Sequence, residues 1–195
     1  PRTVRIGDIN TDGYNDIIVG SNYTRDFTIY YGDGQGGFPQ THKISVPGAA
    51  LMPLIRDFNG NGYNDLFLVT DQQMLVYHGG PNGINLVQTL DNAGAGAEAI
   101  DLDQDGHLDV VALDVNSATG NKIQTFLNNG GGTFTFAQEL PTTQSGWMAA
   151  VGDLDNDGIL DLAVSTRVSP VLRVFLGDGQ GGFKSSLEYN LARRQ

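Results

Sequence analysis

Aspartate is concentrated in four short segments that share one arrangement of side-chain oxygens. Each segment reads D-x-[DN]-x-[DN]-G-x-x-D, and the four begin at Asp8, Asp57, Asp101 and Asp153. Together they hold thirteen of the 22 acidic residues, a clustering that is costly by mutual repulsion unless a cation lies among the carboxylates. Ca²⁺ takes six to eight hard oxygen ligands at about 2.3–2.6 Å, so this spacing predicts a calcium-binding loop.

We expect each loop to bind Ca²⁺ through the side chains at positions 1, 3, 5 and 9 and the backbone carbonyl at position 7. Glycine at position 6 permits the left-handed turn that folds the chain around an ion. The expected ligands are Asp8, Asn10, Asp12, Tyr14 and Asp16 in the first loop, Asp57, Asn59, Asn61, Tyr63 and Asp65 in the second, Asp101, Asp103, Asp105, His107 and Asp109 in the third, and Asp153, Asp155, Asp157, Ile159 and Asp161 in the fourth.

The four loops are unequal, because the second carries only two aspartates, Asp57 and Asp65. We therefore predict up to four Ca²⁺ ions, with the second loop the weakest site. An EF-hand loop begins in the same way but needs Glu at position 12, where this chain has Val19, Leu68, Ala112 and Val164. An Asx-rich turn without a metal is the other alternative. Four such loops in register argue against it.

The segments around the loops must position these carboxylates, and they repeat with the loops. The loop starts are separated by 49, 44 and 52 residues, close to the period of propeller blades. Within each period four β-rich runs are joined by glycine-rich turns, and no stretch shows helical periodicity. The sequence predicts an all-β propeller domain over 1–195 with four-stranded antiparallel blades, at approximately 1–47, 48–91, 92–141 and 142–195. Four blades could close alone, pair with a second chain, or be joined by additional blades in a larger ring.

Composition narrows the function and the compartment. The formal net charge of −11 argues against a nucleic-acid partner, whose phosphates need a basic surface. No apolar run approaches the length of a membrane span, so we expect no membrane insertion. The chain has no cysteine, and Ca²⁺ could take the place of disulfides where it is millimolar. We therefore expect a secreted, extracellular protein.

The loop in GDLDNDGILDLAVS, followed by VLRVFLGDGQGGF, resembles the FG-GAP/VCBS-type repeat of integrin α-subunit propellers and of secreted fungal and bacterial lectin-type propellers. The resemblance covers all four units. It implies a β-propeller in which the calcium loops join the first and second strands of each blade. It also implies the side-chain ligands named above. The Phe-Gly part of the motif is not evident, so the pattern is closer to the VCBS-like form of lectins, adhesins and accessory domains.

A ligand is expected where the repeats differ, in the connections opposite the calcium loops and between blades. These segments carry the candidate ligand-binding residues Tyr23, Arg25, Asn116, Trp147 and Arg167. Aromatic rings beside amides and charges suit sugars. We predict a secreted, calcium-stabilised binding module for a glycan or another cell-surface ligand, with self-association as a further option. The alternative is the propeller portion of a larger polysaccharide- or sugar-active enzyme. The two G-x-G-x-x-G segments are flanked by strands, which favours hairpin turns over a dinucleotide site. No catalytic residue is assigned, and the sequence pattern leans against an enzyme.

Overall fold

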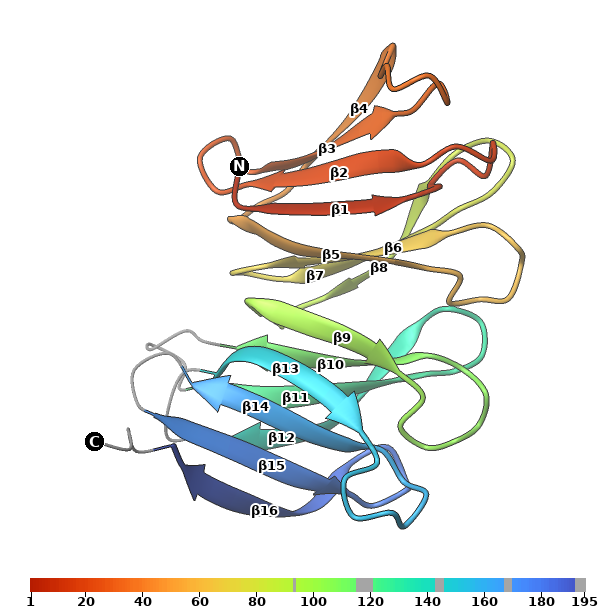
Figure 1. The fold of residues 1–195 in the computed structure, drawn as a ribbon. Helices are drawn as coiled ribbons and strands as arrows, with labels where there is room; N and C mark the ends of the chain where they lie inside the picture. The colour runs from red at the N-terminus through yellow and green to blue at the C-terminus, as the bar shows by residue number, and fades with distance from the viewer. Residues whose placement is uncertain (93, 115–120, 143–145, 167–169, 192–195) are drawn as a thin grey trace. The chain divides into compact units, whose positions relative to one another are not determined.

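The computed structural model of the chain is all-β and describes residues 1–92, 94–114, 121–142, 146–166 and 170–191. Sixteen strands form four antiparallel sheets of four strands each (Figure 1). In every sheet the strands follow one another in chain order, so each sheet is a meander joined by short turns. The predicted fold class, four-stranded antiparallel blades, is confirmed. The described residues contain no helix long and apolar enough to span a membrane.

The chain divides into two compact units. The first unit holds the first and second blades. The strands of the first blade are β1 (Thr3–Gly7), β2 (Asp16–Ser21), β3 (Asp26–Tyr31) and β4 (Gln40–Ser45). Those of the second are β5 (Ala50–Arg56), β6 (Asp65–Thr70), β7 (Met74–His78) and β8 (Asn85–Leu90).

The second unit holds the third and fourth blades, built on the same plan. The strands of the third blade are β9 (Gly96–Ile100), β10 (Asp109–Asp114), β11 (Lys122–Asn128) and β12 (Phe134–Pro141). Those of the fourth are β13 (Gly146–Gly152), β14 (Asp161–Thr166), β15 (Val171–Gly177) and β16 (Phe183–Asn190). In both units the aspartate loops connect the first strand of a blade to its second.

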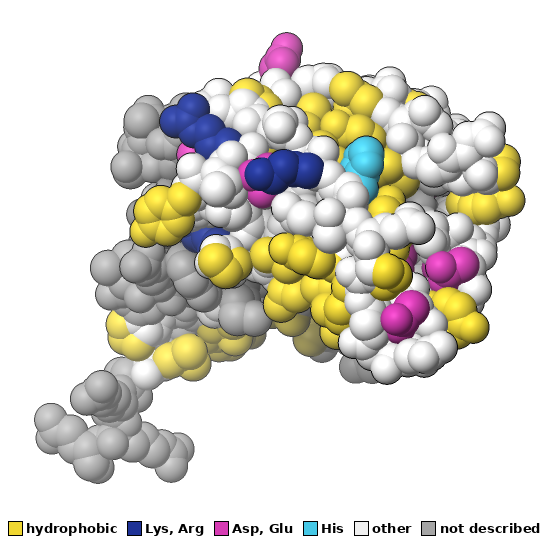
Figure 2. Space-filling model, turned by 90° about the horizontal axis from the view of Figure 1, so that it is seen from above, with side chains coloured by type: hydrophobic (Ala, Val, Ile, Leu, Met, Phe, Trp, Pro, Cys, Tyr) yellow, Lys and Arg dark blue, Asp and Glu magenta, His cyan; other side chains and the backbone are white. Residues whose placement is uncertain are grey.

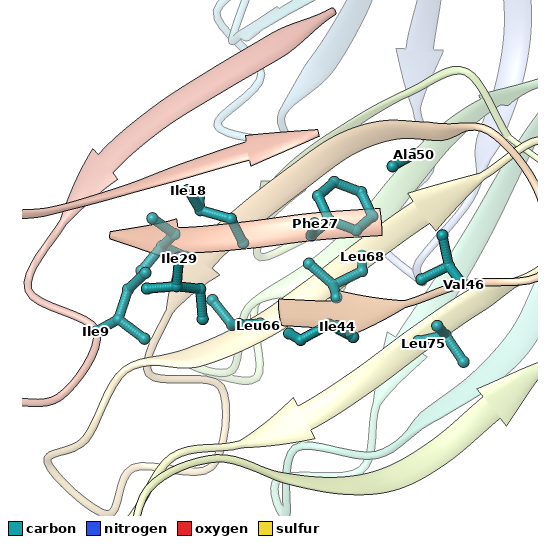
Figure 3. Close-up of a cluster of buried hydrophobic side chains, with 11 residues drawn as sticks. Ile9, Ile18, Phe27, Ile29, Ile44, Val46, Ala50, Leu66, Leu68 and Leu75 are labelled. Carbon is teal, nitrogen blue, oxygen red and sulfur yellow. The ribbon is translucent and has the colours of Figure 1, made fainter. Parts of the chain in front are cut away.

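Blades pack face to face because each sheet has an apolar side that it cannot bury alone. In the first unit β5 lies against β1 and β2, and a core forms between the two sheets. Figure 3 shows Ile18, Phe27 and Ile29 of the first blade facing Leu66 and Leu68 of the second. All five side chains are fully buried, and such burial stabilises the fold by about 1.5–3 kcal/mol per side chain.

The second unit repeats this packing with different residues. There β13 lies against β9 and β10. Leu162, Val164 and Phe175 of the fourth blade share a buried cluster with Val111 and Ile123 of the third. The same strand positions therefore form the core in both units, since the period-two alternation sends every second side chain to the same face.

The fourth strand of each blade is the exposed edge. Nearly all residues of β4 and β16 are exposed, and their sequences QTHKIS and FKSSLEYN are largely polar. Charged residues on such a strand discourage pairing with another chain. Burial is greatest on the second strand, which lies directly after the aspartate loop. The structure therefore attaches each loop to one of the most buried strands of its blade.

Candidate metal centres

Each loop is closed by the aspartate at position 9, which is the first residue of the second strand. Asp16, Asp65, Asp109 and Asp161 are all at most 1% exposed. In each case Oδ2 accepts a hydrogen bond from the backbone amide of position 2, and Oδ1 accepts one from the residue at or just after the end of the third strand. The donor–acceptor distances are 2.7 and 2.9 Å at Asp16, 2.9 and 2.8 Å at Asp65, 2.8 and 2.8 Å at Asp109, and 2.8 and 2.9 Å at Asp161.

The amide that donates to Oδ1 belongs to a glycine in three of the four blades, and the close packing at this point explains why. Gly32, Gly79 and Gly177 donate in three of the blades, and a Cβ on any of them would collide with the carbonyl oxygen of loop position 8. In the third blade the donor is Asn128 instead. Its side-chain Nδ2 donates to the carbonyl oxygen of Leu108, the residue at position 8, at 3.1 Å. Sequence reasoning missed this role of position 9, although the recurring glycine at the end of the third strand was a signal for it.

The remaining loop positions fold the chain back toward position 1. The carboxylate at position 1 accepts a hydrogen bond from the amide of the glycine at position 6, at 2.8–3.0 Å in all four loops. The side chain at position 5 accepts one from the amide of position 7, at 2.8–2.9 Å. The glycines at position 6 have φ values between +85° and +91°, the left-handed region expected for them.

Position 4 is also left-handed, which the sequence did not indicate. Thr11, Gln104 and Asn156 have φ values of +59°, +62° and +60°, and Gly60 has +70°. Only the second loop uses glycine there. A β-branched residue such as Thr11 is strained in this region, so the first loop carries a local cost of about 1–2 kcal/mol.

Three carboxylates come together in the third and fourth loops. Asp101, Asp103 and Asp109 each offer an oxygen within 4.8 Å of the others, and so do Asp153, Asp155 and Asp161. These are positions 1, 3 and 9 of the pattern. Within the part of the chain that the structure describes, no other loop gathers three acidic groups in this way. The carboxylates at position 5, Asp105 and Asp157, lie outside these groups, and a metal role for them and for the carbonyl at position 7 stays a prediction.

Electrostatics distinguish the third loop. Burial raises the pKa of Asp109 from 3.8 to about 6, against the effect of its two backbone hydrogen bonds. The neighbouring carboxylates of Asp103 and Asp105 raise it further. An acidic group that is buried among like charges is stabilised by a cation, because the cation restores its ionised form. The donor set therefore fits a hard divalent ion.

The second loop is closed largely by amides. Asn59 donates from Nδ2 to Asp65 Oδ1 at 3.3 Å, and Asn61 donates from Nδ2 to the carbonyl oxygen of Gly79 at 3.1 Å. Burial raises the pKa of Asp65 as well. These asparagine amides supply hydrogen bonds where the third and fourth loops present carboxylate oxygen, so the second loop holds its shape with less negative charge.

The candidate ligand-binding residues lie mostly outside the described part of the structure. Tyr23 and Arg25 share the four-residue turn between β2 and β3, at the end of the blade opposite the aspartate loop, where Tyr23 is 96% exposed. Asn116 and Arg167 fall outside the described residues. Trp147 belongs to β13, but its side chain is also outside the described part. The structure thus brings together one pair of the five.

These blades and loops define an all-β repeat protein of the propeller type. The model of the FG-GAP-like repeat matches residues 57–112 and 101–164, which together make up more than half of the chain. The chain therefore belongs to the FG-GAP-like repeat family, as the sequence pattern predicts.

Solved structures with the same fold include proteins of different kinds. An Agrocybe aegerita lectin that recognises non-reducing terminal N-acetylglucosamine matches with a TM-score of 0.60 and 21% identity, over 94% of this chain and 50% of the lectin chain. The Vibrio cholerae biofilm matrix protein Bap1 matches with a TM-score of 0.62 and 21% identity, over 97% of this chain and 28% of Bap1. BBS1N in complex with ARL6DN matches with a TM-score of 0.65 and 13% identity, over 96% of this chain and 53% of that chain. This chain thus spans about half the length of the lectin and of BBS1N.

Proposed function

We propose that this chain is a calcium-stabilised binding module of a secreted protein and that its ligand is a glycan. The observation that carries the proposal is the gathering of three carboxylates, within 4.8 Å of one another, in the third and fourth loops of an FG-GAP-like repeat array. The calcium part rests on the chemistry of these loops. The glycan part rests on the fold and on the turn that carries Tyr23 and Arg25.

Calcium is the cation that suits this donor set. All donors are oxygens from carboxylates, amides and backbone, with no His nitrogen or Cys sulfur expected to contact the ion, which favours a hard ion over zinc. In the third loop Asp101, Asp103 and Asp109 would hold the ion. In the fourth loop Asp153, Asp155 and Asp161 would do so. The ion would supply positive charge among carboxylates that otherwise repel one another.

The magnitude of the calcium contribution indicates the compartment. Extracellular calcium modules bind with dissociation constants of about 10⁻⁴–10⁻³ M. At about 1 mM free Ca²⁺, a site of about 10⁻⁴ M stabilises the folded state by about 1.4 kcal/mol. Two to four such sites supply about 3–6 kcal/mol, comparable to the net stability of a small domain. A chain without cysteine gains this stabilisation only where Ca²⁺ is millimolar, which supports secretion.

The loops are expected to fill in an order. The third and fourth loops, with three gathered carboxylates each, bind first. The first loop follows, because Asn10 takes the place of an aspartate at position 3. The second loop binds last, because Asn59 and Asn61 already close it through their amides.

Two features support a glycan ligand. The Agrocybe aegerita lectin with the same fold recognises a terminal N-acetylglucosamine, and Bap1 is a biofilm matrix protein. In this chain the turn between β2 and β3 presents Tyr23 almost fully to solvent, with Arg25 two residues further on. A phenol ring can stack on the C–H face of a sugar while a guanidinium donates hydrogen bonds to hydroxyl or acidic groups.

A glycan array probed with the purified chain at millimolar Ca²⁺ tests the ligand. We expect binding to a defined set of glycans, weakened at least tenfold by Tyr23→Ala. Val87→Ala, which truncates an exposed strand residue of the second blade, is the matched control and should bind like the unmodified chain. An array without any signal, with the protein shown to be folded by circular dichroism, would overturn the glycan proposal.

Calorimetric titration with Ca²⁺ tests the metal proposal separately. The expected result is saturable binding that Asp103→Asn and Asp155→Asn each reduce by one site. Absence of heat and of any change in melting temperature up to 10 mM Ca²⁺ would overturn it, whatever the array shows.

A further inference from the structure

A lysine from outside the aspartate loops reaches the fourth loop. Lys184 is the second residue of β16, and its Nζ lies 3.3 Å from Oδ2 of Asp157, the carboxylate at loop position 5. The other two lysines of the chain, Lys43 and Lys122, pair with carboxylates on strands. On the face of the molecule shown in Figure 2, the few Lys and Arg side chains lie apart from the acidic side chains at the lower right. Among the described residues, Lys184 is the one cation in an ion pair with a loop carboxylate.

A β-bulge directs this lysine toward the loop. In the pairing of β15 with β16, Phe183 lies opposite Gly177, and Ser185 lies opposite Leu176. Lys184 is therefore the extra residue of β16, without a partner on β15. A bulge of this kind bends its strand and redirects the side chain of the extra residue.

The place of this bulge is peculiar to the fourth blade. In the second and third blades the extra residue of the fourth strand is Val87 or Ala137, which lies further from the glycine turn. In the first blade β3 and β4 pair without a shift. The turn before Lys184 also packs on the fourth loop, since a Cβ on Gly179 would lie 3.2 Å from Cδ1 of Ile159 at position 7. The backbone of the fourth blade thus holds this lysine beside the loop.

The third and fourth loops differ at position 5 because of this lysine. In both loops Oδ1 of the aspartate there accepts the amide of position 7 at 2.8 Å. Oδ2 of Asp157 is in addition paired with Lys184, whereas no ion pair within the described residues reaches Asp105. The two loops carry the same number of aspartates, so they differ by one unit of nearby positive charge.

We propose that Lys184 is a tethered cation that competes with Ca²⁺ for the fourth loop. In the metal-free protein its ammonium group offsets the repulsion among the loop carboxylates. When Ca²⁺ binds, the same charge repels the ion or has to leave Asp157, and either event lowers the affinity. The third loop therefore fills before the fourth, although both gather three carboxylates. The inference rests on the proposed calcium function and sets an order between its two strongest sites.

Calorimetric titration of Lys184→Met with Ca²⁺ tests the competition, because methionine keeps an apolar stem and removes the charge. We expect one site to bind about three- to tenfold more tightly, the range for a partly exposed unit charge acting on a divalent ion through water and salt. The gain should shrink in about 1 M KCl, where charges are screened within about 3 Å. Lys184→Arg keeps the charge and should bind as the unmodified chain does.

Two controls assign the effect to the fourth loop. Lys122→Met makes the same change in net charge in the same unit, but its partner is Glu139 on β12, so the calcium affinities should not change. In an Asp155→Asn background, which removes the fourth site, Lys184→Met should have no effect on the remaining sites. If Ca²⁺ binds and Lys184→Met binds it no more tightly, or if the gain persists in the Asp155→Asn background, the inference fails while the calcium function stands. If no variant binds Ca²⁺, both fail.

Urea unfolding provides a measurement that does not depend on resolving individual sites. In EDTA, Lys184→Met should unfold at a lower urea concentration than the unmodified chain, because the loop carboxylates lose a neutralising charge. In about 10 mM Ca²⁺ it should unfold at a higher concentration, because tighter binding adds to the stability of the folded state. A shift of the same sign and size in both conditions would mean that Lys184 acts on the fold alone, and would overturn the competition with Ca²⁺.

Discussion

The aspartate at position 9 should stabilise its blade even in the absence of metal, and the second loop is the place to measure this. Asp65 is fully buried and accepts hydrogen bonds from the backbone amides of Phe58 at 2.9 Å and Gly79 at 2.8 Å. Replacing it by alanine leaves two buried amides without an acceptor. Because the second loop is the weakest expected metal site, the stability lost in this variant should contain almost no contribution from bound calcium.

The size of the effect follows from these contacts. Hydrogen bonds to a charged group contribute about 1.5–3 kcal/mol each, so two of them give about 3–6 kcal/mol. Part of this is offset because burial raises the pKa of Asp65, which means that the ionised carboxylate is itself costly to bury. We expect Asp65→Ala to lower the free energy of unfolding of the first unit by about 2–4 kcal/mol.

Urea unfolding in EDTA at pH 8, followed by circular dichroism, measures this difference. With a slope near 2 kcal/mol per M, the midpoint should fall by about 1–2 M. Asp57→Ala is the matched control from the same loop. Asp57 also accepts two backbone hydrogen bonds, from Asn61 and Gly62, but in a solvent-exposed setting, so its removal should cost less than about 1 kcal/mol. Equal midpoints for the two variants, or a larger loss for Asp57→Ala, would refute the reasoning.

Three further results are expected. Chelation of calcium should lower the melting temperature by about 6–24 °C, since about 3–6 kcal/mol is lost and this chain length converts 1 kcal/mol into about 2–4 °C; an unchanged melting curve in EDTA would contradict the stabilising role. The raised pKa of Asp109, about 6, means that its contribution to the stability of the metal-free fold is full below pH 3.8 and is lost as the pH rises through 6. Calcium and protons therefore compete there, and calorimetry should find the affinity of the third loop about tenfold lower at pH 5 than at pH 7. Thr11→Asn should stabilise the chain by about 0.5–1 kcal/mol in thermal melts, because asparagine tolerates the left-handed φ of +59° better than threonine; a destabilised variant would show that Thr11 has another role.

Much of the local architecture could be predicted from the sequence. The period of 44 to 52 residues and the β-rich runs within it predict four blades of four strands, because alternation and glycine turns are local properties of the chain. The left-handed glycine at position 6, such as Gly62 at +86°, follows in the same way from residue type and spacing. The family is recognisable because its loop is a short, contiguous motif.

The inequality of the loops could be predicted only in part. Residue types indicate that the second loop is poor in carboxylates. They did not indicate that the first loop, with Asp8, Asp12 and Asp16, also lacks the three gathered acidic groups found in the third and fourth. In the first loop position 3 is Asn10, and whether the carboxylates at positions 1, 5 and 9 meet depends on side-chain directions that the spacing alone leaves open.

What the sequence by itself determined is the repeat, its strands, and the chemistry offered by each loop. These depend on residues close together in the chain. What only the tertiary structure decided is where distant segments meet. It brings the backbone amide of Gly79, fourteen residues beyond Asp65 in the chain, into a hydrogen bond with the buried Asp65 carboxylate. Asp65, a predicted metal ligand, therefore also has a structural role. It also buries Leu66 against the first blade while leaving Ile17, at the same position of the repeat, only partly buried. Identical positions in a repeat differ in this way because burial depends on the neighbouring blade, which the repeat's own residues do not encode.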